Sequence, residues 1–362
     1  MSTGISWADE TWNPFVGCRA VSPACANCYA QDMAARIVRM EAGLGRLSHY
    51  ALTVRPTPKG AAWTGHIARA PHKARFAPFG LKRPRDIFVC SMSDFFHAGA
   101  PDEWRIEALA IMALTPRHQY LLLTKRAADM RRFMSSPATA RAVWDKAAKL
   151  AIERNLCFAR IEDMLVGGWP LPNVALGVTA EDQARADERC DDLEATPAAK
   201  RFVSYEPALG PIDLRRWLKL TPDNQPLFFN PPRDHFDWVI CGGESGSNAR
   251  PMSIQWAREL RDQCAAAAVP FFFKQWGEWA PARCRSSGEP GKFVFGDYEF
   301  DRTAWSFSDF YPRQFTMFGS RCVMERLGLR RAGHLLDGVE HHARPFSRSA
   351  PAAAHEHKEA AQ

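Results

Sequence analysis

The sequence lacks the features of a secreted or membrane-spanning chain. No window of its 362 residues holds eighteen apolar residues in a row, which is about the length that crosses a bilayer as a helix. The first residues, MSTGISWADETWNPF, contain no positively charged start followed by an apolar run, so we expect no secretory signal peptide. The sequence therefore predicts a cytoplasmic protein without a membrane segment.

The paired cysteine spacings of a disulfide scaffold are also missing. Seven of the ten cysteines are scattered singly, several inside apolar runs such as IFVC and WVIC, and we expect them to be buried free thiols. The other three, Cys18, Cys25 and Cys28, lie within eleven positions. Three thiolates on one loop can share a soft metal or three irons of an iron–sulfur cluster. A structural zinc site needs a fourth ligand, and the nearest candidates, His49 and Cys90, lack zinc-finger spacing.

Acidic residues are absent from residues 42–85, which contain nine lysines and arginines, more than the net charge of +7 of the whole chain. The same segment carries four aromatic residues and five prolines. Its simpler interpretation is a solvated insertion that covers one end of a barrel. The alternative is a surface that contacts nucleic acid through phosphates and stacked bases.

Short apolar runs recur along a chain that is 46% hydrophobic, enough to bury a large core. Continuous apolar runs are typical of buried parallel strands, and helix-compatible stretches follow them, for example from Pro101 and from Ser253. The spacing of about 30 residues indicates βαβ units and an α/β fold, a full or partial TIM-like (β/α) barrel. We assign it residues 1–279, followed by a C-terminal extension over 280–340 and a disordered tail over 341–362. The runs are NPFVGC (13–18), DIFVCSMSD (86–94), QYLLLTKR (119–126), NVALGVTAED (173–182), KRFVSYEP (200–207), DWVICGGESG (237–246) and PFFFKQWGEW (270–279).

Polar residues follow each run, where the loops of a (β/α) barrel form the active site. Gly242 and Gly243 let the backbone approach a ligand, and Glu244 can accept from an ammonium group. Lys274 and Gln275 suit an anionic or heteroaromatic ligand. Each residue also has a structural interpretation: Lys125 and Glu206 could form an ion pair, and Asp94 could cap a helix. The candidates are Ser91, Ser93, Asp94, Lys125, Thr179, Glu206, Gly242, Gly243, Glu244, Lys274 and Gln275.

The motifs WNPFVGC, SPACANCYA, FVCSMSDFFH, LLTKR, RFVSYEPALGPIDL, VICGGESG, FFFKQWGEW and RAGHLLDG together resemble the phage-associated three-Cys-motif family, which is radical-SAM-like. The resemblance implies a barrel of the radical SAM type, a [4Fe–4S] cluster on Cys18, Cys25 and Cys28, and S-adenosylmethionine as cofactor. It also implies an electron donor and a three-Cys-motif partner protein. The first cysteine gap is six residues instead of the three that are usual in radical SAM enzymes.

We assign cofactor binding to Ser91, Ser93 and Asp94 by this resemblance, and to Thr179, Gly242, Gly243 and Gln275 from their places at the strand ends. Ser91, Ser93 and Asp94 would hold the methionine end of the cofactor. The residues around the substrate would be the catalytic candidates Lys125, Glu206, Glu244 and Lys274.

Two functions follow from these patterns. The first is a radical SAM enzyme that generates a 5′-deoxyadenosyl radical and acts on an unidentified substrate, for which a nucleic acid or nucleotide is a candidate. The alternative is a metal-stabilised nucleic-acid-binding protein without turnover, in which the cysteines and one further ligand hold zinc and residues 42–85 grip phosphate.

Overall fold

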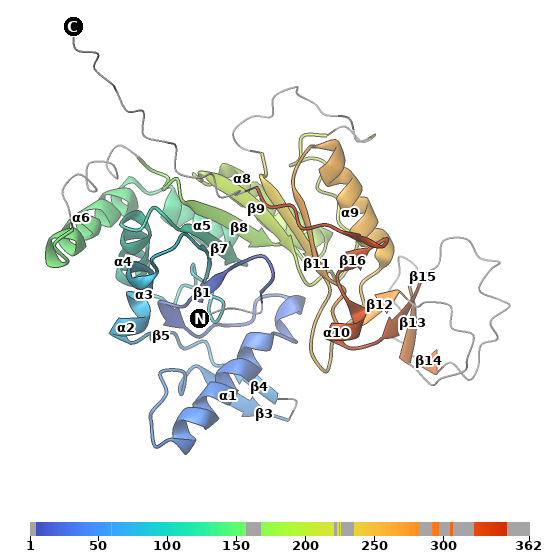
Figure 1. Ribbon diagram of the computed structural model, residues 1–362, viewed down its shortest axis with the longest axis horizontal. Helices are drawn as coiled ribbons and strands as arrows, with labels where there is room; N and C mark the ends of the chain where they lie inside the picture. Colours follow the sequence, from blue (N-terminus) through green and yellow to red (C-terminus); the bar gives the residue numbers. More distant parts are fainter. Residues whose placement is uncertain are drawn as a thin grey trace, which may run out of the picture.

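The computed structural model of the chain describes residues 5–58, 60–156, 168–220, 223, 225, 235–281, 292–296, 305–306 and 322–345. Its centre is a curled sheet with helices packed around it (Figure 1). No helix in the described part of the chain is long and apolar enough to cross a membrane.

Seven parallel strands form the central sheet and give a mixed α/β fold with the shape of a half barrel. The two edge strands do not pair with each other, so the predicted barrel is partial. In spatial order the strands are β1 (Glu10–Trp12), β6 (Asp86–Val89), β7 (Gln119–Thr124), β8 (Val174–Thr179), β9 (Lys200–Tyr205), β10 (Trp238–Gly242) and β11 (Phe271–Gln275).

Six of the seven apolar runs contain strands of this sheet, as predicted. The run at 13–18 is the exception, because the sheet strand β1 lies just before it. Within that run, β2 (Phe15–Val16) pairs antiparallel with β5 (Ala68–Arg69), outside the main sheet. Pro14 lies between β1 and β2, and a proline cannot donate a ladder hydrogen bond.

Alternate residues of the strands face opposite sides of the sheet, and both sides are buried, as expected of parallel strands. On the concave side, Trp7 packs its ring 4.6 Å from that of Phe88 and 6.2 Å from that of Trp238. The other side is covered by helices; Ser253 caps the last of them by accepting from Gln255 N at 3.2 Å. These helices are α4 (Asp102–Ala113), α5 (Ala127–Met134), α6 (Pro137–Glu153), α8 (Gln183–Ala195) and α9 (Ile254–Ala266).

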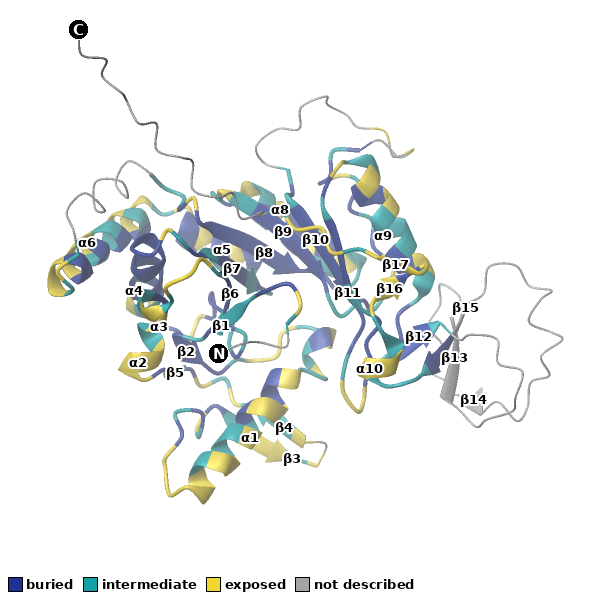
Figure 2. Cartoon of the chain, viewed as in Figure 1, coloured by how far each residue is buried: buried dark blue, intermediate teal, exposed yellow. Residues whose placement is uncertain are grey.

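The segment between β1 and β6 carries the cysteines and the basic insertion. Its described elements are η1 (Pro23–Cys25), α1 (Tyr29–Gly43), β3 (Val54–Thr57), β4 (Gly60–Trp63), β5, α2 (His72–Arg75) and α3 (Ala77–Gly80). The β3–β4 hairpin packs against α1, and Figure 2 shows that this unit is more exposed than the sheet. Part of the basic insertion is neutralised, because Arg69 and Arg75 both pair with the buried Glu107.

The C-terminal extension adds a small antiparallel sheet in the order β12-β15-β13-β14, followed by the hairpin β16–β17. The predicted disordered tail begins too early, because His341 and Ala343 accept hydrogen bonds from Phe273 and Trp238 of the central sheet. Residues 346–362 lie outside the described residues. The extension comprises β12 (Trp279–Pro281), β13 (Lys292–Gly296), β14 (Trp305–Ser306), β15 (Cys322–Arg326), α10 (Leu329–Ala332), β16 (Leu335–Leu336) and β17 (Val339–Glu340).

Candidate functional site

A cavity of about 220 Å³ lies at the carboxyl ends of the central strands. Cys18, Cys25 and Cys28 all line it, together with nine of the other predicted site residues. Gly242 and Gln275 are the predicted residues that do not line it. The nine are Ser91, Ser93, Asp94, Lys125, Thr179, Glu206, Gly243, Glu244 and Lys274.

Gly17 directs the chain into the cysteine loop, which we define as residues 18–28. Its φ of +98° lies in the region that favours glycine, and an added Cβ would lie 2.1 Å from the carbonyl oxygen of His66. Gly17 N donates to Met92 O at 3.0 Å, and Ser93 Oγ donates to Gly17 O at 2.6 Å. The backbone just before Cys18 is therefore fixed to the end of β6.

Asp94 and Arg126 hold the first part of the cysteine loop. Arg126 Nη1 lies 2.8 Å from Asp94 Oδ2 and 3.9 Å from Cys18 Sγ, and its Nη2 donates to Arg19 O at 3.0 Å. The Asp94 carboxylate also accepts from the Thr124 hydroxyl at 2.7 Å. This pair thus links the ends of β6 and β7 to the first cysteine.

Glu181 and Arg189 hold the middle of the loop. Glu181 is fully buried (0% exposed) and accepts a hydrogen bond from the Ser22 hydroxyl. Arg189, 2% exposed, lies 3.4 Å from the Glu181 carboxylate and donates to Thr179 O at 2.7 Å. The Ser22 hydroxyl also lies 3.7 Å from Cys25 Sγ, so this pair anchors the loop next to its second cysteine.

Glu244 and Arg250 hold the last part. Arg250 contacts the buried Glu244 carboxylate through Nε at 2.8 Å and Nη2 at 2.5 Å, a two-pronged geometry that makes a strong charge-assisted pair. Asn27 donates to Glu244 Oε2 at 3.1 Å, and Arg250 Nη2 donates to Pro23 O at 3.1 Å. In this structure Glu244 therefore holds the part of the cysteine loop that precedes Cys28, through Asn27 and Arg250.

Gly243 brings the end of β10 against the turn after β11. An added Cβ on Gly243 would lie 1.9 Å from Trp276 O. The side chain of Gln275 donates to Gly243 O at 3.0 Å. These residues fix the rim of the cavity by backbone contact.

Lys274 and Glu206 form a hydrogen-bonded ion pair on the cavity wall. The ion pair between Glu206 and Lys125 that the sequence offers as a structural alternative does not form, since Glu206 pairs with Lys274. The Lys125 ammonium instead acts on Cys28, where its charge opposes the rise in pKa that burial causes. Two buried polar atoms in the cavity lining, Trp7 Nε1 and Ser204 Oγ, have no hydrogen-bond partner among the described residues.

Burial controls the protonation of two of the three thiols. It raises the pKa of Cys18 to about 12, with further contributions from Asp94 and Cys28. Burial also raises the pKa of Cys28, and Cys25 adds to the shift. The protein alone therefore holds Cys18 and Cys28 as neutral thiols, and a bound metal would have to displace their protons.

Sequence reasoning found the cysteines and the strand ends but missed the contacts that position the loop. Glu181 lies at the end of the predicted run NVALGVTAED (173–182), whereas Ser22, Asn27, Arg189 and Arg250 carry no local signal. Ser22 and Glu181 are 159 residues apart in the sequence. The available signal was the position of Glu181 just after the buried strand β8, which marks a carboxylate at the mouth of the half barrel.

Comparison with known proteins gives a family match. The profile of a family described as a protein of unknown function (DUF5131) matches residues 2–345. No curated protein and no solved structure matches the chain.

Proposed function

The chain belongs to the DUF5131 family, and we propose that it is an iron–sulfur enzyme of the radical SAM type. Cys18, Cys25 and Cys28 would hold a [4Fe–4S] cluster, and S-adenosylmethionine would bind beside it in the cavity. The observation that carries the proposal is that all three cysteines line the same cavity as the carboxyl ends of the strands, where (β/α) barrels place their active sites.

The three cysteine sulfurs are not arranged as a preformed site for a single zinc ion. Tetrahedral zinc with Zn–S bonds of about 2.3 Å holds its sulfur ligands about 3.8 Å apart. In the described part of the chain, the cysteine sulfurs do not form a group of ligand atoms within 4.8 Å of one another. A cluster binds each sulfur at a different iron and so needs wider spacing. At least one pair of the cysteine sulfurs is therefore farther apart than in a zinc site, and metal analysis separates the enzyme from the zinc-stabilised binding protein.

The cofactors, when bound, would supply the electron and the 5′-deoxyadenosyl radical, and the protein would supply position and a water-poor chamber. The ion pairs Asp94–Arg126, Glu181–Arg189 and Glu244–Arg250 would fix the loop that presents the thiolates. Asp94 already accepts hydrogen bonds from several donors. We therefore assign it, with Ser93, to positioning the loop, while Ser91 pairs with Asn13 at the cavity wall.

Contacts with cofactor and substrate would fall to the remaining lining residues. Lys125 is placed to meet a carboxylate near Cys28, while Thr179 and the Lys274–Glu206 pair face the cavity from β8, β9 and β11. Trp7, packed on Phe88, would contribute an apolar part of the lining.

Anaerobic reconstitution with iron and sulfide tests the proposal. We expect a broad absorption band near ~400 nm, typical of iron–sulfur clusters bound by thiolates, and 5′-deoxyadenosine after adding S-adenosylmethionine and dithionite. Cys28→Ala should lose both signals. Cys264→Ala, which removes a buried thiol of α9 outside the cavity, is the matched control and should keep them. A protein that takes up zinc but no iron or sulfide would refute the assignment.

Nucleic acid is the substrate class that the basic insertion favours. Arg46, Arg55, Lys73, Lys82 and Arg83 are exposed within a segment without acidic residues. Binding to single-stranded nucleic acid should then weaken steeply with salt, because phosphate contacts release counterions. Salt-independent binding would remove this part of the proposal.

A further inference from the structure

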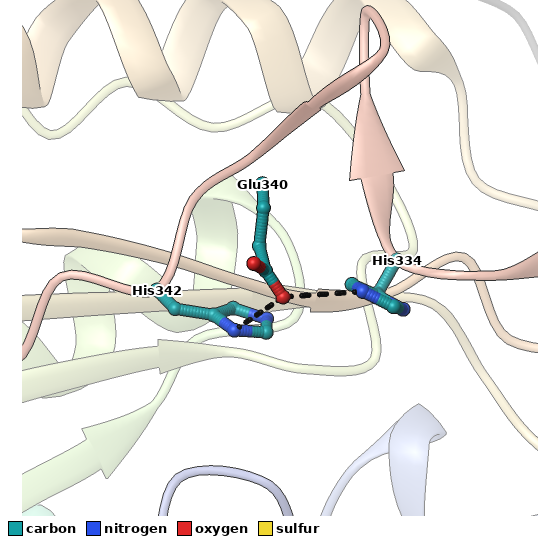
Figure 3. Close-up of side chains that lie close together, drawn as sticks. All are labelled: His334, Glu340 and His342. Carbon is teal, nitrogen blue, oxygen red and sulfur yellow. Dashed lines mark ion pairs between the residues drawn. The ribbon is translucent and has the colours of Figure 1, made fainter.

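Three metal-binding side chains converge on the C-terminal hairpin, away from the cavity. His334 precedes β16, Glu340 ends β17 and His342 follows it. Their ligand atoms all lie within 4.8 Å of one another. Figure 3 shows the Glu340 carboxylate pointing between the two imidazole rings. None of the three lines the cavity at the strand ends.

The spacing suits one small metal ion. Glu340 Oε1 lies 3.2 Å from His334 Nε2 and 3.0 Å from His342 Nδ1. Zinc binds imidazole nitrogen and carboxylate oxygen at about 2.0–2.2 Å, so two tetrahedral ligands lie about 3.3 Å apart. The three atoms therefore need only small shifts to surround an ion.

The backbone on both sides of each histidine is tied to the central sheet. Gly333 O and Leu335 O, which flank His334, accept from Trp276 N at 3.1 Å and Trp276 Nε1 at 2.9 Å. The carbonyls that flank His342 accept in the same way. His341 O takes a hydrogen bond from Phe273 N at 2.7 Å, and Ala343 O takes one from Trp238 Nε1 at 2.9 Å.

The ring of His342 and the hairpin turn are also fixed. His342 stacks on Phe272 with ring centroids 4.5 Å apart and planes 10° from parallel. Asp337, in the turn between β16 and β17, is held by Arg258 and Arg261 of α9. The ligands thus stand on a rigid support, although their side chains are reached by solvent: His334 is 50% exposed and His342 34%.

We propose that His334, Glu340 and His342 form a binding site for a divalent transition-metal ion, zinc in particular. Two imidazoles and one carboxylate are a ligand set that zinc uses in proteins, with the fourth position left to water. The site is separate from the cysteine loop, so it stands or falls independently of the proposed enzyme activity. An ion here would join the two ends of the hairpin that covers the edge strand β11.

The test is zinc and cobalt titration of the metal-free, full-length protein under reducing conditions. The wild type and the variants carry the same cysteines, so the difference between their titration curves gives the metal binding by the hairpin alone. We expect His342→Asn and Glu340→Gln to weaken one equivalent of binding at least about tenfold, the scale on which metal sites respond even to the loss of outer partners. In the wild type, that equivalent should give cobalt absorption without a thiolate charge-transfer band.

His341→Asn is the matched control, because His341 is adjacent to His342 but lies against Phe271, outside the cluster. A double change of His355 and His357 to asparagine controls for metal binding by the tail. Both controls should bind as the wild type does. The proposal is overturned if His342→Asn binds as tightly as His341→Asn, or if the wild type takes up no metal in excess of the Glu340→Gln variant. Circular dichroism of each variant establishes that the fold is retained.

Discussion

Replacing Glu181 by alanine should destabilise the protein strongly, because the buried Arg189 guanidinium would keep, among the described residues, only the Glu188 carboxylate, which lies 3.9 Å away and is 60% exposed, as a counter-charge. Glu181 is 0% exposed and Arg189 2%, so solvent cannot screen the loss. Breaking a buried pair by removing one partner costs about 3–5 kcal/mol. Arg189 would retain its hydrogen bond to Thr179 O, which favours the lower end of that range.

Ser22→Ala tests the hydrogen bond that holds the cysteine loop without breaking the ion pair between Glu181 and Arg189. It removes one hydrogen bond to the Glu181 carboxylate but leaves the ion pair with Arg189. Hydrogen bonds to charged groups contribute about 1.5–3 kcal/mol, so the loss should be smaller than for Glu181→Ala. In the double variant, Ser22 has already lost its acceptor, so its removal should add almost nothing. The two changes should therefore be clearly non-additive.

Denaturant unfolding of the metal-free protein measures all three free energies. Asp192→Ala is the matched control, because it breaks an arginine pair whose side chains are 52% and 22% exposed, and such surface pairs contribute about 0–1 kcal/mol. The reasoning fails if Glu181→Ala costs no more than Asp192→Ala. Additive losses for Ser22 and Glu181 would show that the serine does not act through this carboxylate.

Other predictions follow from the entry to the loop and from its thiols. Gly17→Ala should prevent assembly of the proposed cluster, because the added Cβ would meet His66 O. Gly43→Ala, whose added Cβ meets nothing within 4 Å, should leave assembly intact, and the iron content after reconstitution distinguishes the two variants. Cys18 in the metal-free protein should be alkylated slowly at pH 8. A pKa raised from 9.0 to about 12 leaves roughly a thousandfold less thiolate at this pH. Mass spectrometry measures the rate of Cys18 alkylation, and a rate equal to that of a free thiol would contradict the prediction. The pKa of Cys18 is higher in the folded protein than in the unfolded chain, so its contribution to stability is fully present below pH 9 and is lost as the pH rises toward 12. Unfolding curves recorded from pH 8 to 11 should therefore show a falling free energy of unfolding. If the proposed iron–sulfur cluster is bound, Arg126→Met should lower its reduction potential, because the change removes a positive charge and a donor near Cys18 Sγ. A redox titration that shows no shift would exclude this electrostatic role.

The strand positions could be predicted because buried parallel strands leave a local signature. Runs such as YLLLT and FFF are apolar on both faces, and each lies within a strand of the sheet. β1 escaped this rule, since Glu10 and Thr11 are polar and the strand is three residues long. The gathering of strand ends at one mouth then followed from topology alone, which is why most of the predicted site residues line the cavity.

The partners of those residues could not be predicted, because the ion pairs depend on distances across the fold. Nothing near Glu244 in the sequence indicates that Asn27, 217 residues away, donates to it. A polar side chain at a strand end can face a ligand or hold a loop, and the sequence alone does not separate the two. The hairpin cluster was missed for a different reason: His342 fell in a segment whose composition indicated a tail, while its position depends on the stacking against Phe272.

The long gap between Cys18 and Cys25 has a structural explanation in these contacts. Arg19, Ser22 and Pro23 all lie within the gap, and each is bonded to a different ion pair: Arg19 O to Arg126, the Ser22 hydroxyl to Glu181 and Pro23 O to Arg250. These partners stand at the ends of β7, β8 and β10, so the additional residues let the loop cross the mouth of the half barrel. A gap of three residues would be too short to keep all of these anchors. The departure from the usual spacing therefore changes how the loop is held, while its three thiols still line a single cavity.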